Sequence, residues 1–191
     1  MRIFIAIDLP GSIRSEIERR QNFFRAALSH SPGDAAGIRW TRPEAIHLTL
    51  KFLGEVTDAG LERLVEHLGR LEPFEAFSLE VKSFGFFPDA RHPRVFWAGV
   101  MGPPELPALS VLIETAVSDL SFGKELRPFS PHLTLARFRS NRPQTVLEAM
   151  SKREEDVSLG RFVVSEFFVF ESKLSASAAP EYRKVTRFPL R

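Results

Sequence analysis

The sequence predicts an α+β fold with two pseudo-symmetric lobes, each an antiparallel sheet flanked by helices, around a central cleft. The first reason is that predicted strands twice follow one another without a helix between them, at 74–87 with 94–100 and at 161–174 with 182–190. Such consecutive strands are typical of antiparallel sheets rather than of a doubly wound parallel sheet. The second reason is a nine-residue phrase that occurs twice, each time on a predicted strand. We therefore expect residues 1–191 to form a single domain made of two lobes.

The start of the chain shows clear strand and helix patterns. "RIFIAIDL" carries isoleucine or leucine at every second position, which predicts a strand with one face well buried. Residues 11–29 follow as a helix, because Ile13, Ile17 and Phe24 recur near helical spacing. "HSPGDAAG" is then a loop by its proline and glycine content.

The later elements are predicted from the same periodicities and from turn and cap residues. They are strand material around 38–53 that Pro43 interrupts, a helix from Thr57 or Asp58 to about Leu71, a strand pair at 74–87 and 94–100, a helix at about 104–121, the strand "HLTLARF", a short helix from Arg142 to Lys152, the strand 161–174 and the final strand "YRKVTRFPL".

Composition is that of a globular protein and excludes several kinds of chemistry. Hydrophobic residues make up 43% and charged residues 26%, and there are 18 phenylalanines, so we expect an aromatic-rich core. The absence of cysteine excludes disulfides, thiol nucleophiles and thiolate metal sites. The apolar stretch at the N-terminus is too short for a signal peptide, and no apolar run approaches the roughly 20 residues of a membrane span. We expect a soluble, cytoplasmic and monomeric protein.

Basic residues are concentrated in two segments although the formal net charge is only +2. The segment 124–142 has five basic residues against one acid, and the segment 181–191 has four against one. Such local excess suits a polyanionic partner. A solvated basic surface explains it equally well.

The repeated phrase is "RPEAIHLTL" at 42–50 and "RPFSPHLTL" at 127–135, with six of nine positions identical. Side chains at positions i and i+2 of a strand share a face. Each copy therefore presents one imidazole and one hydroxyl together, His47 with Thr49 in the first and His132 with Thr134 in the second, while leucines point the other way. We expect one lobe to carry the motif at 47–50 and the other the motif at 132–135, both facing one cleft.

Two histidines and two threonines in one cleft suit the hydrolysis of a phosphodiester. Histidine titrates near pH ~6.5, so one imidazole can accept a proton while the other donates one. Threonine hydroxyls can donate hydrogen bonds to the phosphate oxygens. Duplication with residues kept only for packing is the competing explanation, and it accounts for the leucines but not for the outward His and Thr.

The chain resembles the two-histidine (2H) phosphoesterases, and within them the RNA 2',3'-cyclic phosphodiesterases, also known as 2'-5' RNA ligases. The resemblance covers nearly the whole chain. Its carriers are "RIFIAIDLP", "IRWTRPEAIHLTLKFLGEV", "FGFFPDARHPRVFWAGV", "RPFSPHLTLARF", and "ESKL" with Tyr182 near the end. The loop "SASAAPEY" departs from the family, whose members often carry a glycine there.

The resemblance implies hydrolysis of a terminal 2',3'-cyclic phosphate on RNA, tRNA-like fragments included, to a 2'-phosphomonoester without metal or cofactor. It also implies a reversible 2'-5' joining activity. His47 would be the proton donor, His132 the proton acceptor, and Thr49 and Thr134 would hold the phosphate oxygens. The near-symmetry of the phrase itself does not say which histidine is which.

Arg137 is the fifth residue that the resemblance places at the phosphate. Strict strand alternation puts it on the face opposite His132, so a bulge or the strand end must redirect it. The first copy has Phe52 at the matching position. Phe4 and Phe52 are further candidates for stacking on a base, whereas core packing is the expected role of Trp40 and Trp97.

Other functions remain open from the sequence. The same catalytic pair could cleave 2'-5'-linked oligonucleotides or small cyclic nucleotides, and a non-catalytic RNA-binding module could retain the same cleft. His30 and His67 are expected to be surface or packing residues, and His92 fits a hairpin turn as well as an RNA contact. The phrase lacks the further His or carboxylate at ligand spacing that a metal site needs.

Overall fold

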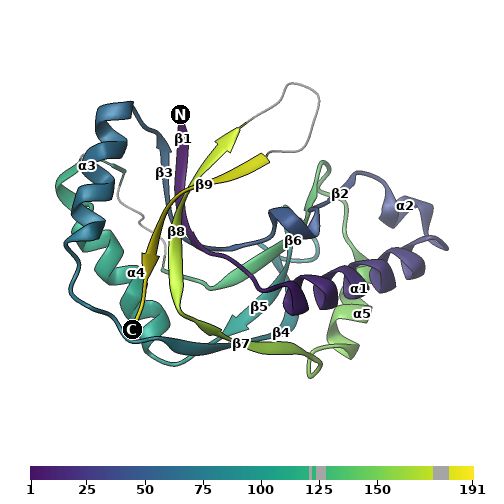
Figure 1. Ribbon diagram of the computed structural model, residues 1–191. Helices are drawn as coiled ribbons and strands as arrows, with labels where there is room; N and C mark the ends of the chain where they lie inside the picture. Colours follow the sequence, from purple (N-terminus) through teal and green to yellow (C-terminus); the bar gives the residue numbers. More distant parts are fainter. Residues whose placement is uncertain (121, 124–127, 174–180) are drawn as a thin grey trace.

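The strands of the protein form one antiparallel sheet, in the order β7-β4-β5-β6-β3-β1-β8-β9, with the short strand β2 paired to β6 (Figure 1). The structure is a computed structural model that describes residues 1–120, 122–123, 128–173 and 181–191. Its elements are β1 (Arg2–Ile7), α1 (Gly11–Leu28), α2 (Pro32–Ala35), β2 (Ile38–Trp40), the 3-10 turn η1 (Pro43–Ala45), β3 (Leu48–Glu55), α3 (Asp58–Gly69), β4 (Phe77–Phe87), β5 (Val95–Met101), α4 (Glu105–Ala116), the 3-10 turn η2 (Ser118–Leu120), β6 (His132–Phe138), α5 (Thr145–Arg153), β7 (Ser158–Val164), β8 (Glu166–Lys173) and β9 (Glu181–Pro189).

The sheet consists of two equivalent halves that join between β3 and β6. One half is β3-β1-β8-β9 and the other is β6-β5-β4-β7, and the pairing of Leu48 with Leu133 connects them. Helices α3 and α4 cover the first half, and α1 and α5 cover the second (Figure 1). The predicted α+β class with helix-flanked antiparallel strands is confirmed, with the two sheets continuous across this join.

Two helices cross from one half to the other. Helix α1 follows β1 of the first half but packs against β7, and α4 follows β5 of the second half but packs against β3. Each half is therefore completed by a helix whose preceding strand belongs to the other half. This exchange ties the two halves together around their common boundary.

The prediction of one strand at 161–174 was wrong, because this stretch contains two strands separated at Ser165. Strand β7 pairs with β4 in one half, whereas β8 pairs with β1 and β9 in the other. The chain thus passes between the halves at Ser165 and Glu166, inside a stretch whose other residues are mostly apolar, and strand periodicity alone does not reveal that passage. The predicted loop 30–37 also differs, since it contains the four-residue helix α2.

Strand β1 is buried on both faces, which exceeds the one buried face that its alternation predicts. Ile3, Ile5 and Ile7 belong to the main core. Phe4 and Ala6, on the other face, form a second apolar cluster with Phe168 and Phe170 of β8 and with partly buried Tyr182 of β9. This second cluster lies directly beside the functional site described below.

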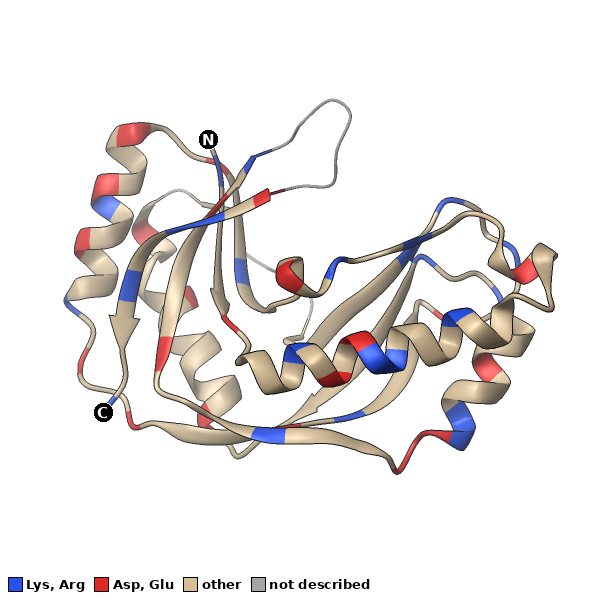
Figure 2. Cartoon of the chain, turned by 45° about the vertical axis from the view of Figure 1, so that its right-hand side comes forward, with Lys and Arg blue, Asp and Glu red and all other residues tan. Residues whose placement is uncertain are grey.

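The two basic segments behave differently in the structure. On β9, Arg183 and Arg187 form ion pairs with carboxylates of β8, and Lys184 pairs with Asp8. Lys and Arg positions also occur over strands of the other half of the sheet (Figure 2). Lys124 and Arg127 of the first segment lie outside the described residues. No helix in the described ranges has the length and apolar character that crossing a bilayer requires.

Candidate active site

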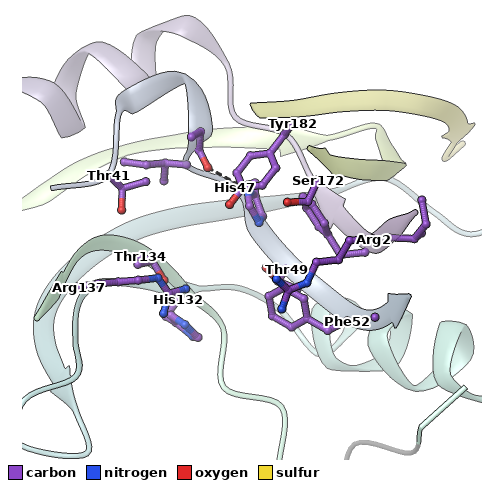
Figure 3. A pocket seen from close by; sticks show the side chains of 15 residues that line it. Arg2, Thr41, His47, Thr49, Phe52, His132, Thr134, Arg137, Ser172 and Tyr182 are labelled. Carbon is purple, nitrogen blue, oxygen red and sulfur yellow. Dashed lines mark hydrogen bonds between the residues drawn. The ribbon is translucent and has the colours of Figure 1, made fainter. Parts of the chain in front are cut away.

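A cleft of about 520 Å³ opens where the two halves of the sheet meet (Figure 3). The residues that line it are Arg2, Ile3, Phe4, Thr41, Ala45, Ile46, His47, Thr49, Phe52, Gly54, His132, Thr134, Arg137, Ser172 and Tyr182. They include all five site residues that the sequence analysis singled out. Segments from both ends and the middle of the chain therefore converge on one site.

The two copies of the phrase lie against each other at the boundary between β3 and β6. Leu48 pairs directly with Leu133, and both leucine side chains are fully buried. Because this pairing is antiparallel, the residue before one leucine faces the residue after the other leucine. His47 therefore lies across from Thr134 and Thr49 across from His132, with all four side chains half-buried at the cleft.

Both imidazoles are oriented by the same backbone contact. Nδ1 of His47 donates to the carbonyl oxygen of Ala45 at 3.0 Å, and Nδ1 of His132 donates to that of Ser130 at 2.7 Å. A carbonyl can only accept, so this contact fixes the proton on Nδ1 of the neutral ring. Nε2 of each ring is then the nitrogen that can exchange a proton with a substrate. Ala45 and Ser130 occupy the same position of the phrase.

The two histidines differ in their surroundings. The His47 ring stacks on Phe4 with the ring centroids 4.5 Å apart, and it meets the edge of Tyr182 at 5.0 Å. Burial in this aromatic cluster lowers the pKa of His47 to about 4. The His132 ring meets Phe87 edge-on at 4.9 Å, and partial burial lowers its pKa, with a smaller contribution from the Arg137 cation.

A bulge in β6 turns Arg137 toward the cleft. Phe96 of β5 pairs with Ala136 and the next residue, Trp97, pairs with Thr134, so Leu135 is the extra residue. Leu135 and Ala136 are consecutive and both fully buried. The alternation is shifted by one after this point, and Arg137 falls on the same face as Thr134. This is the redirection that strand parity requires for Arg137 to lie beside His132.

Strand β3 has the same bulge at the matching position. Ile5 of β1 pairs with Lys51 and Ala6 with Thr49, which leaves Leu50 as the extra residue. Phe52 is thereby turned to the cleft, where its side chain is 62% exposed. The two halves are therefore equivalent in backbone but differ in side chain, with the ring of Phe52 in the first half and the guanidinium of Arg137 in the second.

Comparison with known proteins shows the same architecture and similar sequences. The family model described as LigT like Phosphoesterase matches residues 7–97. An RNA 2',3'-cyclic phosphodiesterase of Methanothermobacter thermautotrophicus is 31% identical over 192 residues, covering 100% of this chain and 99% of the relative. The chain belongs to the LigT-like phosphoesterase family. It is a phosphoesterase of the two-histidine type, as its resemblance to that family implied.

Solved structures agree with this assignment over the full length. The crystal structure of TT0787 of Thermus thermophilus has a TM-score of 0.79 at 28% identity and covers 100% of this chain and 98% of that one. E. coli LigT complexed with 3'-AMP has a TM-score of 0.77 at 28% identity and covers 99% and 97% of the two chains. The chain therefore shares its overall fold with both of these proteins.

Four polar residues of this LigT-like cleft were missed as site residues by the sequence analysis. They are Arg2, Thr41, Ser172 and Tyr182. Arg2 could have been found from the sequence, because alternation along β1 places it on the same face as Phe4. Tyr182 comes from β9 and reaches the site only through sheet pairing with Ser172 of β8. Burial raises the pKa of its hydroxyl, so the phenol stays protonated and can donate a hydrogen bond.

The other aromatic and histidine residues considered in the sequence analysis pack in the core or lie outside the cleft, apart from Phe4, which supports the His47 ring. Phe4 is 2% exposed and supports the His47 ring, so its faces are occupied. Trp40 packs edge-on against core Phe96, as expected. His67 contacts the carbonyl of its own helix, outside the cleft. Within the described ranges, no three His, Cys, Asp or Glu side chains are grouped as a metal site would require.

Proposed function

We propose that this LigT-like phosphoesterase hydrolyses the terminal 2',3'-cyclic phosphate of RNA to a 2'-phosphomonoester by two-histidine acid–base catalysis. The observation that carries the proposal is the pair of imidazoles, His47 and His132, each fixed through Nδ1 and each presenting Nε2 to one cleft. The similar proteins support the substrate class, since several are named RNA 2',3'-cyclic phosphodiesterase and E. coli LigT has been crystallised with 3'-AMP.

The reaction needs one proton acceptor and one proton donor on opposite sides of phosphorus. Nε2 of His132 takes a proton from water as the water oxygen forms a bond to phosphorus. The bond from phosphorus to the 3'-oxygen breaks, and Nε2 of His47 gives its proton to that oxygen. One water is consumed, the 2'-phosphomonoester is released, and exchange with solvent returns both imidazoles to their starting states.

The remaining polar groups bind the phosphate oxygens. Thr49 and Thr134 lie beside the two imidazoles and can donate to the non-bridging oxygens, and Arg137 supplies a cation. A bound phosphodiester anion also raises the pKa of a nearby imidazole. For His47, whose pKa of about 4 leaves it neutral at pH 7 in the free protein, this anion is what would supply the protonated donor.

The same step accounts for 2'-5' joining. A 5'-hydroxyl of a second RNA end takes the place of water, loses its proton to His132 and forms the bond to phosphorus, while the 3'-oxygen leaves with the proton of His47. Neither version of the step uses a metal ion. Both therefore predict activity in the presence of a chelator.

The deciding experiment is a pH–rate profile for an RNA oligomer ending in a 2',3'-cyclic phosphate, with EDTA present and the product isomer identified. We expect a bell-shaped profile, a 2'-phosphate product, and turnover lowered by about 10²–10⁴-fold in His47→Ala and in His132→Ala. His67→Ala, outside the cleft, is the matched control. Turnover retained in both cleft variants would refute the mechanism, and binding without turnover would favour an RNA-binding module. A panel with 2'-5'-linked oligonucleotides and small cyclic nucleotides separates the substrate alternatives.

A further inference from the structure

Three arginines form a strip that leads out of the cleft on the face that carries the histidines. We define this arginine strip as Arg39 of β2, Arg137 of β6 and Arg139, which directly follows β6. Arg39 pairs directly with Arg137 across the strands, and directly opposed residues project from the same face. Arg139 lies two positions beyond Arg137 and so faces the same way.

Each member of the arginine strip is exposed, and the residues between them point inward. Ile38, Trp40, Ala136 and Phe138 are buried or half-buried against the core, whereas all three arginines are exposed. Figure 2 shows basic positions close together on these strands. In the described part of the chain, no carboxylate lies within 4 Å of the three guanidinium groups.

Like charges directly opposite each other on paired strands destabilise a sheet. The Arg39–Arg137 pair is such an arrangement, and it lies at the mouth of a cleft that would already hold one phosphate. An anion placed over the pair would remove the repulsion and gain charge-assisted hydrogen bonds from both guanidinium groups. The arrangement therefore fits a ligand with a second negative charge close to the first.

The arginine strip lies at one end of the cleft only, and the symmetry-related end has Phe52 in place of Arg137. Strands β3 and β6 run in opposite directions from the paired Leu48 and Leu133, so Phe52 and Arg137 lie at opposite ends (Figure 3). The first end has an exposed ring, and the second has the arginine strip. A nucleotide chain has the same polarity, with a base on one side of its terminal phosphate and the preceding phosphate on the other.

We infer that Arg39 and Arg139 of the arginine strip form a second phosphate subsite next to Arg137, and that this subsite binds the phosphate on the 5' side of the terminal nucleotide of the RNA. The inference rests on the proposed function and adds to it a preference for a nucleotide chain over a mononucleotide. Arg137 serves the cyclic phosphate, and Arg39 with Arg139 serves the phosphate before it. The base of the terminal nucleotide then lies toward Phe52.

The test compares two substrates that differ by this one phosphate. They are a nucleoside 2',3'-cyclic monophosphate and a dinucleotide ending in a 2',3'-cyclic phosphate, assayed with the full-length protein, Arg39→Gln and Arg139→Gln. We expect the ratio of kcat/KM for dinucleotide over mononucleotide to fall about tenfold in Arg39→Gln, since hydrogen bonds to charged groups contribute about 1.5–3 kcal/mol. The log–log salt dependence for the dinucleotide should become about 0.7 less steep. Arg63→Gln, an exposed arginine on α3, changes the net charge equally and serves as control.

The outcomes separate the subsite from the reaction. An unchanged substrate ratio in both Arg39→Gln and Arg139→Gln would overturn the subsite while leaving hydrolysis intact. An equal fall in Arg63→Gln would show general steering by charge and would also overturn it. Failure of the unsubstituted protein to turn over either substrate would refute the proposed function itself, and the subsite with it.

Discussion

The side-chain amide of Gln21, on α1, donates a 2.9 Å hydrogen bond to the carbonyl oxygen of Leu135, the residue at which β6 bulges. The same nitrogen donates to the carbonyl of Thr41 at 2.8 Å, and the backbone N–H of Thr41 also donates to Leu135. Helix α1 and the strand next to β6 thus hold the bulge together. The bulge turns Arg137 into the cleft. Gln21 does not line the cleft, but by holding the bulge it helps to place a positive charge there.

The first half of the sheet has an equivalent contact. The hydroxyl of Ser110, on α4, donates to the carbonyl of Leu50 at 3.4 Å, and Leu50 is the extra residue in the bulge of β3. Helices α1 and α4 are the two that cross between the halves. The exchange of helices therefore provides each bulge with a side-chain donor from the crossing helix.

The first prediction concerns Gln21. Gln21→Met keeps the length of this buried side chain but removes the donor, so we expect a loss of about 1–3 kcal/mol in the free energy of unfolding. We also expect a higher KM, with kcat less affected, because Arg137 loses its fixed backbone. Urea unfolding and steady-state kinetics measure the two effects.

The matched control is Asn22→Met on the exposed face of the same helix. A stability loss in Gln21→Met without any change in KM would show that the contact supports the fold alone. Ser110→Ala tests the contact at the other bulge, and its weaker geometry predicts a smaller loss of stability.

Local sequence patterns predict most of the elements, and the repeated phrase predicts that both of its copies face one cleft. Alternation identifies β1, and Thr57 does cap α3 through its side chain. The division of 161–174 into β7 and β8 was not predicted, because only Ser165 and Glu166 interrupt residues 162–170, which are otherwise apolar and β-forming. The two strands are distinguished by their pairing with distant strands, which this short polar interruption alone does not reveal.

The site was predictable in its side chains but not in its backbone. The repeated phrase predicts that the two histidines and two threonines face one cleft, and strand parity predicts that a bulge or the strand end redirects Arg137. The imidazoles are oriented by the backbone carbonyl oxygens of Ala45 and Ser130. Side-chain patterns in the sequence do not predict these backbone contacts. The unequal pKa values of the histidines arise from rings on remote strands, as the stacking of Phe4 on His47 shows.

The second prediction concerns the ion pair of Asp8 and Arg14 next to His47. Arg14 donates to the carbonyl of Ile46 at 3.1 Å and pairs with Asp8, so it fixes the chain just before the histidine. After burial and the Ala45 contact, its cation lowers the pKa of His47 and the Asp8 carboxylate raises it. Arg14→Met should therefore raise the pKa of His47, and Asp8→Asn should lower it. NMR titration of the imidazole measures both.

A variant that keeps the charge separates electrostatics from position. Arg14→Lys retains the cation but loses the planar donor group, so it should leave the pKa of His47 close to its original value while lowering kcat. If Arg14→Met and Asp8→Asn moved the pKa in the same direction, a general change of structure rather than charge would be responsible.

The third prediction concerns Phe52 at the aromatic end of the cleft. A base stacked on an aromatic side chain contributes roughly 1–3 kcal/mol, so Phe52→Ala should weaken inhibition by a nucleoside 2'-phosphate by about ten- to a hundredfold. Stability should change little, since the ring is 62% exposed. Val163→Ala, also exposed but on β7, is the control. Unaltered inhibition in Phe52→Ala would place the base elsewhere.

The last prediction links His47 to the pH dependence of stability. Burial holds its pKa at about 4 in the folded protein, whereas the unfolded chain binds the same proton near the ordinary value of 6.5. Between these two values the unfolded state carries more protons, so stability falls as the pH falls from about 6.5 to 4. The contribution of His47 over this window is ~3 kcal/mol at about 1.4 kcal/mol per pKa unit.

Removing the imidazole should remove this dependence. The difference in the free energy of unfolding between the unsubstituted protein and His47→Asn, followed by urea unfolding from pH 7 to pH 4, should shift in favour of the variant as the pH falls. Carboxylates that do not interact with His47 contribute alike in both proteins and cancel in the difference. A difference that stays constant across this range would mean that the His47 pKa is not depressed, and that the aromatic cluster of Phe4 and Tyr182 does not shield it.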